Sequence, residues 1–393
     1  MILIINGGSS SIKFALYKQG NLSAKIFYGQ LSRVGLPHSE FTFHHLNTGE
    51  KQTIPFNGQD FTSAIAWLMD WLEKRVDMTR VIAIGHRVVH GMQHREPSLI
   101  TAELLLALKQ CIPYDPDHLP NEIKLVEAFR QQHPQIDQFA CFDTAFHQTM
   151  PRVARLLAVP RRFDALGIQR YGFHGLSYNY LVQELEKQDG KGMINQRIVL
   201  AHLGNGASLA AVHEGKSIDS SMGFTPASGL PMSTRSGDLD PGVAWFMMKT
   251  DKLSPTQFNH LVNHESGLLG ISETSADMTD LLRQEATDIR SAEAVNLFCY
   301  QVKKWIGAFA AAMGGIDGLV FAGGIGEHAP IVRARICRGL EFLGIELDEK
   351  RNAGNDALIS ADTGKVAVRV MHTDEEWMVA KIVSGMIVDK GIK

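Results

Sequence analysis

Two segments of this chain, 196 residues apart, share one pattern of apolar and small polar residues. Residues 3–16 read LIINGGSSSIKFAL, and residues 199–212 read VLAHLGNGASLAAV. Each combines an apolar run, a turn rich in glycine and small polar residues, and a second apolar run, and Gly8 aligns with Gly204. The offset is about half of the 393 residues. This repeat predicts that the chain folds as two related α/β units.

Two weaker pairs of segments recur in the same order. RVIAIGHRVVHG (80–91) resembles DGLVFAGGIGEH (317–328), and QFACFD (138–143) resembles VRVMHTD (368–374). Each is an apolar strand followed by glycine or aspartate. Ligands of α/β proteins bind at such strand ends, so two facing units of this kind predict a ligand cleft between them.

Short apolar runs alternate with longer amphipathic stretches over the whole chain, which is typical of an α/β protein. The pattern predicts strands at residues 2–6, 12–17, 81–84 and 319–322 and helices at 61–72 and 294–312.

Composition excludes several other classes of protein. Lys plus Arg is 39 and Asp plus Glu is 42, so a broad basic surface for nucleic acid is not indicated. No run of about 18 apolar residues predicts a membrane span, and the first residues do not form a signal peptide. The four cysteines form no C-x-x-C pair, which favours reduced thiols in a cytoplasmic protein. The P-loop, dinucleotide-binding, zincin and serine-hydrolase motifs do not occur in the sequence.

Three turns have the composition of phosphate-binding loops. NGGSSS (6–11) follows a strand and precedes Lys13, HLGNG (202–206) has the same form, and AGGIGEH (322–328) ends a strand where a helix is predicted to begin. Glycines let a phosphate approach the backbone N–H groups. Structural tight turns are the alternative for all three, and Asn-Gly is also a strong hairpin signal.

Several charged residues stand beside these turns. Arg87 directly follows a predicted strand and Arg235 lies in a polar turn, where each could hold a phosphoryl group or a carboxylate. A surface ion pair is the alternative. Asp143 ends a buried strand and needs a partner. Glu375 and Glu376 form either the start of a helix, where acidic side chains are favoured, or a Mg²⁺ site. His174, in RYGFHG, is either a catalytic or a structural histidine.

Eight blocks together resemble the acetate kinase family, which belongs to the superfamily of acetate and sugar kinases, Hsp70 and actin. In chain order they are NGGSSSIKF, GHRVVHG, FDTAFHQTMP, RYGFHG, HLGNGAS, TRSGDLDPG, GGIGE and TDEE. The resemblance extends from Ile4 to about Ala380. It implies an α/β fold of duplicated actin- and ribonuclease-H-like domains with a ligand cleft between them. The first domain would comprise residues 1–146 and 377–393, and the nucleotide-binding domain residues 147–376.

The resemblance implies a reversible, Mg²⁺-dependent transfer of the γ-phosphoryl group of ATP to acetate, which gives acetyl phosphate and ADP. It also implies Mn²⁺ as a substitute for Mg²⁺, a cytoplasmic location and a homodimer. Kinases of propionate or butyrate, and an enzyme that uses pyrophosphate as phosphoryl partner, are the alternatives within the fold. A non-enzymatic, ATP-driven interaction protein is the alternative from another class.

The resemblance also implies a role for each matching residue. The residues at the reaction centre would be Arg87, Asp143, His174 and Arg235. Those on the phosphate side and in the nucleotide segments would be Ser9, Ser11, Lys13, His202, Leu203, Gly204, Asn205, Gly206, Asp277, Met278, Thr279, Gly324, Ile325, Gly326, Glu327 and His328. Metal ligands would be Asn6 and Glu375. The pocket for the methyl group would be formed by Val89, Leu119, Phe173 and Pro226, with Arg87 holding the carboxylate.

Some positions depart from the family pattern. Thr279 stands where an arginine near the adenine is usual, and His328 stands where asparagine is common. Asp374 replaces an asparagine, and Leu176 and Tyr178 replace threonine and histidine. The first two departures leave the nucleotide base, and the phosphoryl donor itself, open.

Overall fold

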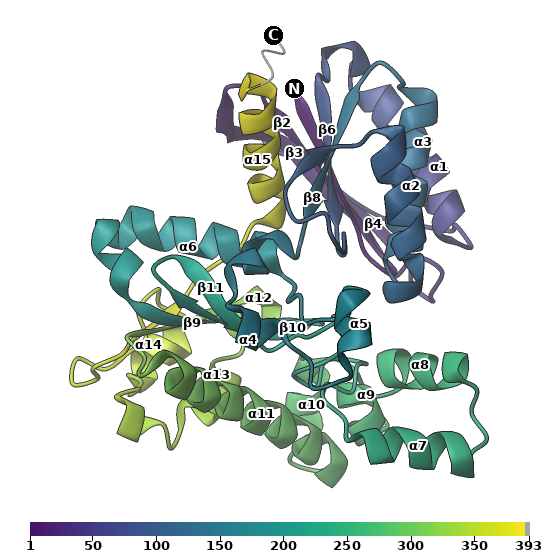
Figure 1. Ribbon diagram of the computed structural model, residues 1–393. Coiled ribbons are helices and arrows are strands. Elements are labelled where there is room, and N and C mark those ends of the chain that lie inside the picture. Colours follow the sequence, from purple (N-terminus) through teal and green to yellow (C-terminus); the bar gives the residue numbers. More distant parts are fainter. Residues whose placement is uncertain (390–393) are drawn as a thin grey trace. The chain divides into compact units, whose positions relative to one another are not determined.

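The computed structural model describes residues 1–389. The chain forms two compact units, each with its own sheet. Unit 1 consists of Met1–Ala145 and of the chain from Asp374 onward, and unit 2 is Phe146–Thr373 (Figure 1).

The sheet of unit 1 has eight strands in the order β5-β4-β3-β2-β1-β6-β8-β7. In chain order they are β1 (Ile2–Gly7), β2 (Ile12–Lys18), β3 (Asn21–Ser32), β4 (Glu40–His45), β5 (Lys51–Pro55), β6 (Ala83–Val88), β7 (Ser98–Leu99) and β8 (Asp137–Phe142). β1 to β5 form an antiparallel meander, whereas β1, β6 and β8 run parallel to one another. The carboxyl ends of these three strands therefore lie at the same edge of the sheet.

Helices cover both faces of this sheet. They are α1 (Phe61–Arg75), α2 (Ala102–Cys111), α3 (Leu119–Gln132) and α15 (Glu375–Asp389), with short 3₁₀ turns at Met78–Arg80 and Ile112–Tyr114. Figure 1 shows α1 and α3 on one face and α15, in yellow, on the other. Gly85 allows α15 to approach β6, because a Cβ atom there would lie 2.7 Å from Val379 Cγ1 and 2.9 Å from Val383 Cγ2.

The sheet of unit 2 has five strands in the order β11-β10-β9-β12-β13. They are β9 (Arg197–Leu203), β10 (Ala207–His213), β11 (Lys216–Ser220), β12 (Gly318–Ala322) and β13 (Ala367–Val370). Tyr178, Leu181 and Leu185 of α6 (Gly175–Asp189) pack on one face. The long helix α11 (Ile289–Met313) covers the other face (Figure 1).

The remaining helices of unit 2 connect or flank this layer. They are α4 (Arg152–Arg155), α5 (Arg161–Ala165), α7 (Pro241–Thr250), α8 (Pro255–His264), α9 (Gly267–Ser272), α10 (Met278–Gln284), α12 (Gly323–His328), α13 (Pro330–Cys337) and α14 (Glu349–Gly354). Short 3₁₀ turns lie at Ala145–Thr149, Gly190–Asn195 and Glu341–Leu343.

The two sheets share one topology. The order β3-β2-β1-β6-β8 in unit 1 corresponds to β11-β10-β9-β12-β13 in unit 2. In each of these two rows the first two pairings are antiparallel and the last two are parallel. The two segments that are 196 residues apart in the sequence form the hairpins β1–β2 and β9–β10. The duplicated α/β fold predicted from that repeat is confirmed.

Each predicted strand and helix is present, but some boundaries were wrong. β6 extends to Val88, so Arg87 lies inside the strand rather than after it, because pairing with β8 continues to the register Val88–Phe142. β13 ends at Val370, well before Asp374, and the last helix begins at Glu375 rather than at Trp377. The domain assignment stays a prediction, because compactness alone does not assign a nucleotide to either unit. All four cysteines are buried and free, and no helix among residues 1–389 is long and apolar enough to span a membrane.

We expect Gly85→Ala to destabilise unit 1 by about 1–3 kcal/mol, because the added methyl group would collide with α15. Gly385→Ala, in the same helix α15, is the matched control. Nothing lies within 4 Å of a Cβ atom at Gly385, so better helix propensity should raise stability by roughly 0.5–1 kcal/mol. Urea unfolding of both variants checks the prediction, and equal effects would contradict it.

Candidate active site

Three polar residues meet where the parallel strands of unit 1 end. Asn6 lies near the end of β1, Arg87 near the end of β6, and Asp143 directly follows β8. The register pairs Ile5 with His86 and Val88 with Phe142, so the three positions are neighbours across the sheet. The parallel topology alone therefore gathers an amide, a guanidinium and a carboxylate at one edge.

Arg87 is the centre of this group. Its Nε and Nη2 donate to Asp143 Oδ2 at 3.1 and 2.5 Å, and Nη1 lies 3.4 Å from Asn6 Oδ1. Glu375 Oε2 lies 3.8 Å from Arg87 Nε. The side chain of Arg87 is 14 % exposed and that of Asp143 is fully buried. Nε and Nη2 thus fix the guanidinium, and in the part of the chain that the structure describes Nη1 makes one long contact, with Asn6.

The charges of this pair depend on each other. Burial disfavours the charged form of Arg87, but Asp143 and Glu375 outweigh it and raise the pKa of the guanidinium above its ordinary value. Burial also raises the pKa of the Asp143 carboxyl, and Glu375 adds to the rise while Arg87 opposes it. Arg87 therefore remains a cation at every accessible pH. Its positive charge favours the ionised form of the buried Asp143 carboxyl.

Two glutamates at the start of α15 complete the group. Asn6 Nδ2 donates to Glu375 Oε2 at 3.3 Å and to Glu376 Oε1 at 2.9 Å. They are the first residues of α15, where its N-terminal dipole favours acidic side chains. The alternative of a helix start is thus confirmed, and it does not exclude metal binding by the same carboxylates.

The oxygen atoms of this group fit a magnesium ion that arrives with phosphate. Mg²⁺ usually binds one or two carboxylates together with substrate phosphates and water. Glu375 offers such a carboxylate, and Oδ1 of the buried Asp143 has no hydrogen-bond partner among residues 1–389. No cluster of three or more His, Cys, Asp or Glu side chains in that range could hold a metal ion by itself. The residues therefore fit a shared site better than a closed protein cage.

The turn between β1 and β2 is tightly closed. Gly8 N donates to Ser11 O at 2.7 Å, and Val34 N donates to Ser10 O at 2.9 Å. Ser9 is exposed at the tip, and Lys13 is exposed on β2. The structure thus brings Ser9, Ser11 and Lys13 to the same end of the sheet as Asn6, and their binding of phosphate stays a prediction.

His174 lies at a special backbone position in unit 2. It precedes α6 and has φ 57°, in the left-handed region that only a few side chains adopt. Its Nδ1 is 2.9 Å from Ser208 Oγ, and its ring stacks on His202 with ring centres 4.3 Å apart. Ser208 in turn contacts the Tyr178 hydroxyl at 2.5 Å. The contacts with Ser208 and His202 thus fix the plane of the His174 ring.

His174 and Arg235 lie beside the same glycine. A Cβ atom on Gly206 would be 3.3 Å from His174 Nε2 and 3.8 Å from Arg235 Nη1. Arg235 Nη1 also donates to Pro226 O at 3.2 Å. The close approach favours glycine at 206. It places an imidazole nitrogen and a guanidinium at the turn that was predicted to bind phosphate.

The two glycine turns of unit 2 are also close to each other. β9 and β12 are parallel neighbours, so residues 204–206 and 323–324 follow strands that end at one edge. A Cβ atom on Gly204 would lie 3.9 Å from Gly324 N. Gly323 has φ 77°, and a Cβ atom there would lie 2.7 Å from Leu203 O, so this position requires glycine. The structure therefore gathers His202 to Gly206 with the start of the GGIGEH segment.

The other nucleotide segments have visible structural roles. Asp277 is the N-cap of α10, where Oδ1 accepts from Thr279 N at 2.7 Å. Glu327 accepts from Gly323 N at 3.0 Å and contacts His372 Nδ1 at 3.0 Å. A nucleotide contact for the remaining predicted residues of these segments (Met278, Thr279, Ile325, Gly326, His328) stays a prediction.

The predicted methyl pocket has members in both units. Val89 and Leu119 are buried in unit 1, and Phe173 and Pro226 are buried in unit 2. Their burial agrees with apolar packing. A single pocket formed by all four stays a prediction.

Two residues of these surroundings were not found from the sequence. Glu122, on α3, accepts from Val89 N with both carboxylate oxygens, at 3.2 and 3.1 Å. The ring of His147 contacts Ser217 Oγ at 2.8 Å and the carbonyl oxygen of Phe173, the residue before His174, at 2.9 Å. The sequence does contain a signal for Glu122. It is an acidic residue on the apolar face of a helix, three residues after the buried Leu119.

Comparisons with known proteins identify the family of this chain. A family model described as the Acetokinase family matches residues 1–381. The acetate kinase of Thermoanaerobacterium thermosaccharolyticum is 44 % identical over 395 residues, which cover 97 % of each chain. That of Carboxydothermus hydrogenoformans is 41 % identical and covers 99 % of this chain and 100 % of its own.

Solved structures give the same result. The acetate kinase of Porphyromonas gingivalis has a TM-score of 0.85 and 38 % identity, over 98 % of this chain and 99 % of that one. A propionate kinase from Francisella tularensis has a TM-score of 0.89 and 34 % identity, over 97 % and 98 %. Both neighbours have the actin-like ATPase fold, so the predicted fold class is confirmed.

The chain belongs to the acetokinase family. Members of this family are phosphotransferases with a carboxyl group as acceptor, and their chemistry is that of ATP-dependent kinases with acetate and ATP as small-molecule substrates.

We expect His147 to make the stability of the protein sensitive to acid. Burial lowers the pKa of His147 to about 4, against an ordinary value of about 6.5. The unfolded chain therefore binds a proton that the folded protein does not, and stability is lost as pH falls from about 6.5 to about 4, by about 3 kcal/mol in full. His147→Gln should reduce this loss, as measured by urea unfolding at several pH values. Unfolding at pH 7.5 gives the cost of the lost hydrogen bonds separately, and an unchanged pH slope would contradict the assignment.

Proposed function

We propose that this chain catalyses the reversible transfer of the γ-phosphoryl group of ATP to acetate, which gives acetyl phosphate and ADP. The observation that carries the proposal is the partly buried Arg87, which Asp143 fixes through two nitrogens, while Nη1 makes one long contact within residues 1–389. A guanidinium held in this way suits a small carboxylate, because its planar nitrogens match the geometry of the two oxygens.

The acceptor does not need a general base. A carboxylic acid with a pKa of about 4–5 is already ionised at pH 7, so one of its oxygens can attack the γ-phosphorus as the bond to the β-phosphate oxygen breaks. Asp143 therefore acts by orienting Arg87 rather than by taking a proton. The difficulty of the reaction is the approach of two anions, which requires well-placed positive charge.

In unit 2, His174 and Arg235 supply hydrogen-bond donors for the transferring phosphoryl group. Both lie beside Gly206, and the His174 ring is fixed by Ser208 and His202. Donors that are already in place stabilise charge that develops in the transition state at little cost of reorganisation. The neighbouring turns at 204–206 and 323–324 suit the phosphates of the nucleotide.

Mg²⁺ belongs to the proposed site, with Glu375 and Asn6 as the residues that hold it and Mn²⁺ as a substitute. When bound with the nucleotide, it would neutralise phosphate charge. Ser9, Ser11 and Lys13 line the same end of the unit 1 sheet and are proposed to face the phosphates.

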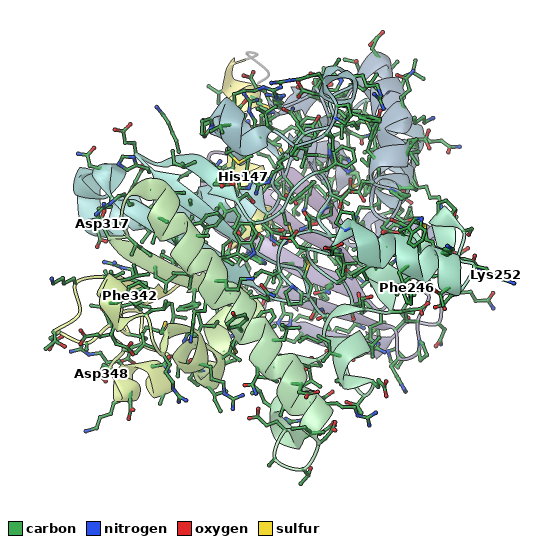
Figure 2. The ribbon with its side chains drawn as sticks, turned by 60° about the horizontal axis from the view of Figure 1, so that its bottom comes forward. His147, Phe246, Lys252, Asp317, Phe342 and Asp348 are labelled. Carbon is green, nitrogen blue, oxygen red and sulfur yellow. The ribbon has the colours of Figure 1, made fainter. Side chains whose placement is uncertain are left out.

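We also propose that the protein is a cytoplasmic homodimer that associates through α7. None of the residues of α7 is buried, and Trp245 and Phe246 are 60 % and 61 % exposed. Figure 2 shows Phe246 on this helix. Adjacent exposed aromatic residues are typical of association surfaces.

Hydroxamate formation tests the function directly. Acetate, ATP and Mg²⁺ with hydroxylamine should give acetyl hydroxamate, and kcat/KM for acetate should exceed that for propionate and for butyrate, because one methylene in an apolar pocket is worth about 1–3 kcal/mol. Pyrophosphate in place of ATP should give no product. Higher kcat/KM with propionate or butyrate would assign the alternative acyl substrate, and activity with pyrophosphate alone would assign the other phosphoryl partner. No hydroxamate from any acid would overturn the proposal.

Removal of either arginine should lower the rate strongly. We expect Arg87→Ala and Arg235→Ala each to reduce kcat by about 100-fold or more, because one lost donor costs roughly 2.7–4 kcal/mol in the transition state. Arg75→Ala in unit 1 and Arg351→Ala in unit 2 remove arginines from exposed ion pairs and serve as matched controls. An arginine whose removal leaves kcat within threefold of wild type has no part in the reaction.

A further inference from the structure

We infer that Glu122 is a positioning residue of the acyl-acceptor site, because it fixes the backbone at Val89 beside Arg87. The inference rests on the proposed function, in which Arg87 binds the carboxylate of the acceptor. Glu122 itself does not have to touch a substrate: it acts through the backbone that follows β6.

The N–H group of Val89 needs an unusual partner. β6 ends at Val88, where the strand pairing with β8 also ends, and Asp143 N donates to Val88 O at 3.0 Å. Val89 is buried, so water cannot satisfy its N–H group. Both oxygens of Glu122 accept from it, at 3.2 and 3.1 Å. A side chain from a distant helix therefore determines where the chain runs two residues after Arg87.

The first turn of α3 also contacts the other ligand turn of unit 1. A Cβ atom on Gly7 would lie 3.7 Å from Glu122 Cγ, so the stem of Glu122 lies against the end of β1. Next to it, Asn121 Nδ2 donates to Ser9 O at 3.3 Å. One helical turn thus holds both the turn after β1 and the end of β6, which carry Asn6 and Arg87.

The side chain acts here as a hydrogen-bond acceptor, and its negative charge is not what matters. Glu122 is 3 % exposed. Burial raises the pKa of the Glu122 carboxyl well above its ordinary value, and the nearby Asp115 and Asp143 add to the rise. Arg87 and the hydrogen bond from the Val89 N–H group oppose it. Glutamine keeps a carbonyl oxygen of the same reach without a charge. Glu122→Gln is therefore expected to preserve the contact, whereas alanine removes it.

Kinetic constants distinguish a positioning role from general stabilisation. We expect Glu122→Ala to raise KM for acetate about fivefold or more with KM for ATP changed less than about twofold, and Glu122→Gln to keep both within about twofold. Glu127→Ala is the matched control, since Glu127 lies on the same helix in an exposed ion pair with Lys109. Equal changes in the two KM values, or an effect of Glu122→Gln as large as that of alanine, would overturn the inference.

Hydrogen exchange tests the contact without any activity. The amide of Val89 should be protected in the wild-type protein and in Glu122→Gln, and should exchange about tenfold faster or more in Glu122→Ala. Glu122→Met, which fills the space without an acceptor, replaces the alanine variant if that variant does not fold. A Val89 amide that exchanges in the wild-type protein as fast as an exposed amide would overturn the inference. If the wild-type protein has no acetate kinase activity but the protection of the Val89 amide still responds to these substitutions, the contact with Glu122 is confirmed. The proposed function is then what has failed.

Discussion

The ion pair between Arg87 and Asp143 is the interaction around which unit 1 is organised. A guanidinium held away from water is stable only when it is paired and hydrogen-bonded. Here Arg87 lies near the end of β6, and its partners come from three other segments that are distant in sequence: the end of β1, the residue after β8, and the start of α15. The parallel arrangement of the three strands brings these ends together. Gly85 lets α15 approach closely enough for Glu375 to join them. The strand order of the sheet thus places Arg87 and its three partners at one edge.

Unit 2 repeats the strand order but holds different chemistry at the same edge. The turns after β1 and β9 both contain glycines, but the ends of the next parallel strands differ. Unit 1 has Arg87 near the end of β6, whereas β12 ends at the apolar Ala322 and is followed by Gly323 and Gly324. His174 and Arg235 come from segments outside the shared strands, and both approach the turn at Gly206. The duplication therefore supplied two similar frames, and in the proposed function the frame of unit 1 holds the acyl acceptor and the metal, and that of unit 2 holds the phosphates. This division of roles is what the proposed phosphoryl transfer requires.

Much of this could be predicted from the sequence, because the signals were local. Apolar runs and glycine turns gave β1, β9 and β12, and the matching blocks pointed to Arg87, Asp143 and Glu375. The position of Arg87 inside β6 was missed because the length of that strand is set by pairing with β8, which no local pattern records. Glu122 was missed for a similar reason: its partner is a backbone N–H group 33 residues away. Contacts that depend on long-range pairing become visible only when the strands are assembled.

The central claim is that Arg87, held by Asp143, binds the carboxylate of the acceptor. Titration of ¹³C-labelled acetate, followed by its NMR line width in the presence of ADP and Mg²⁺, tests this most directly. The wild-type protein should broaden the acetate signal in a saturable way. Arg87→Lys keeps the charge but does not keep the planar fork, so it should abolish the broadening while ADP still binds. Saturable acetate binding of wild-type strength in Arg87→Lys would contradict the account.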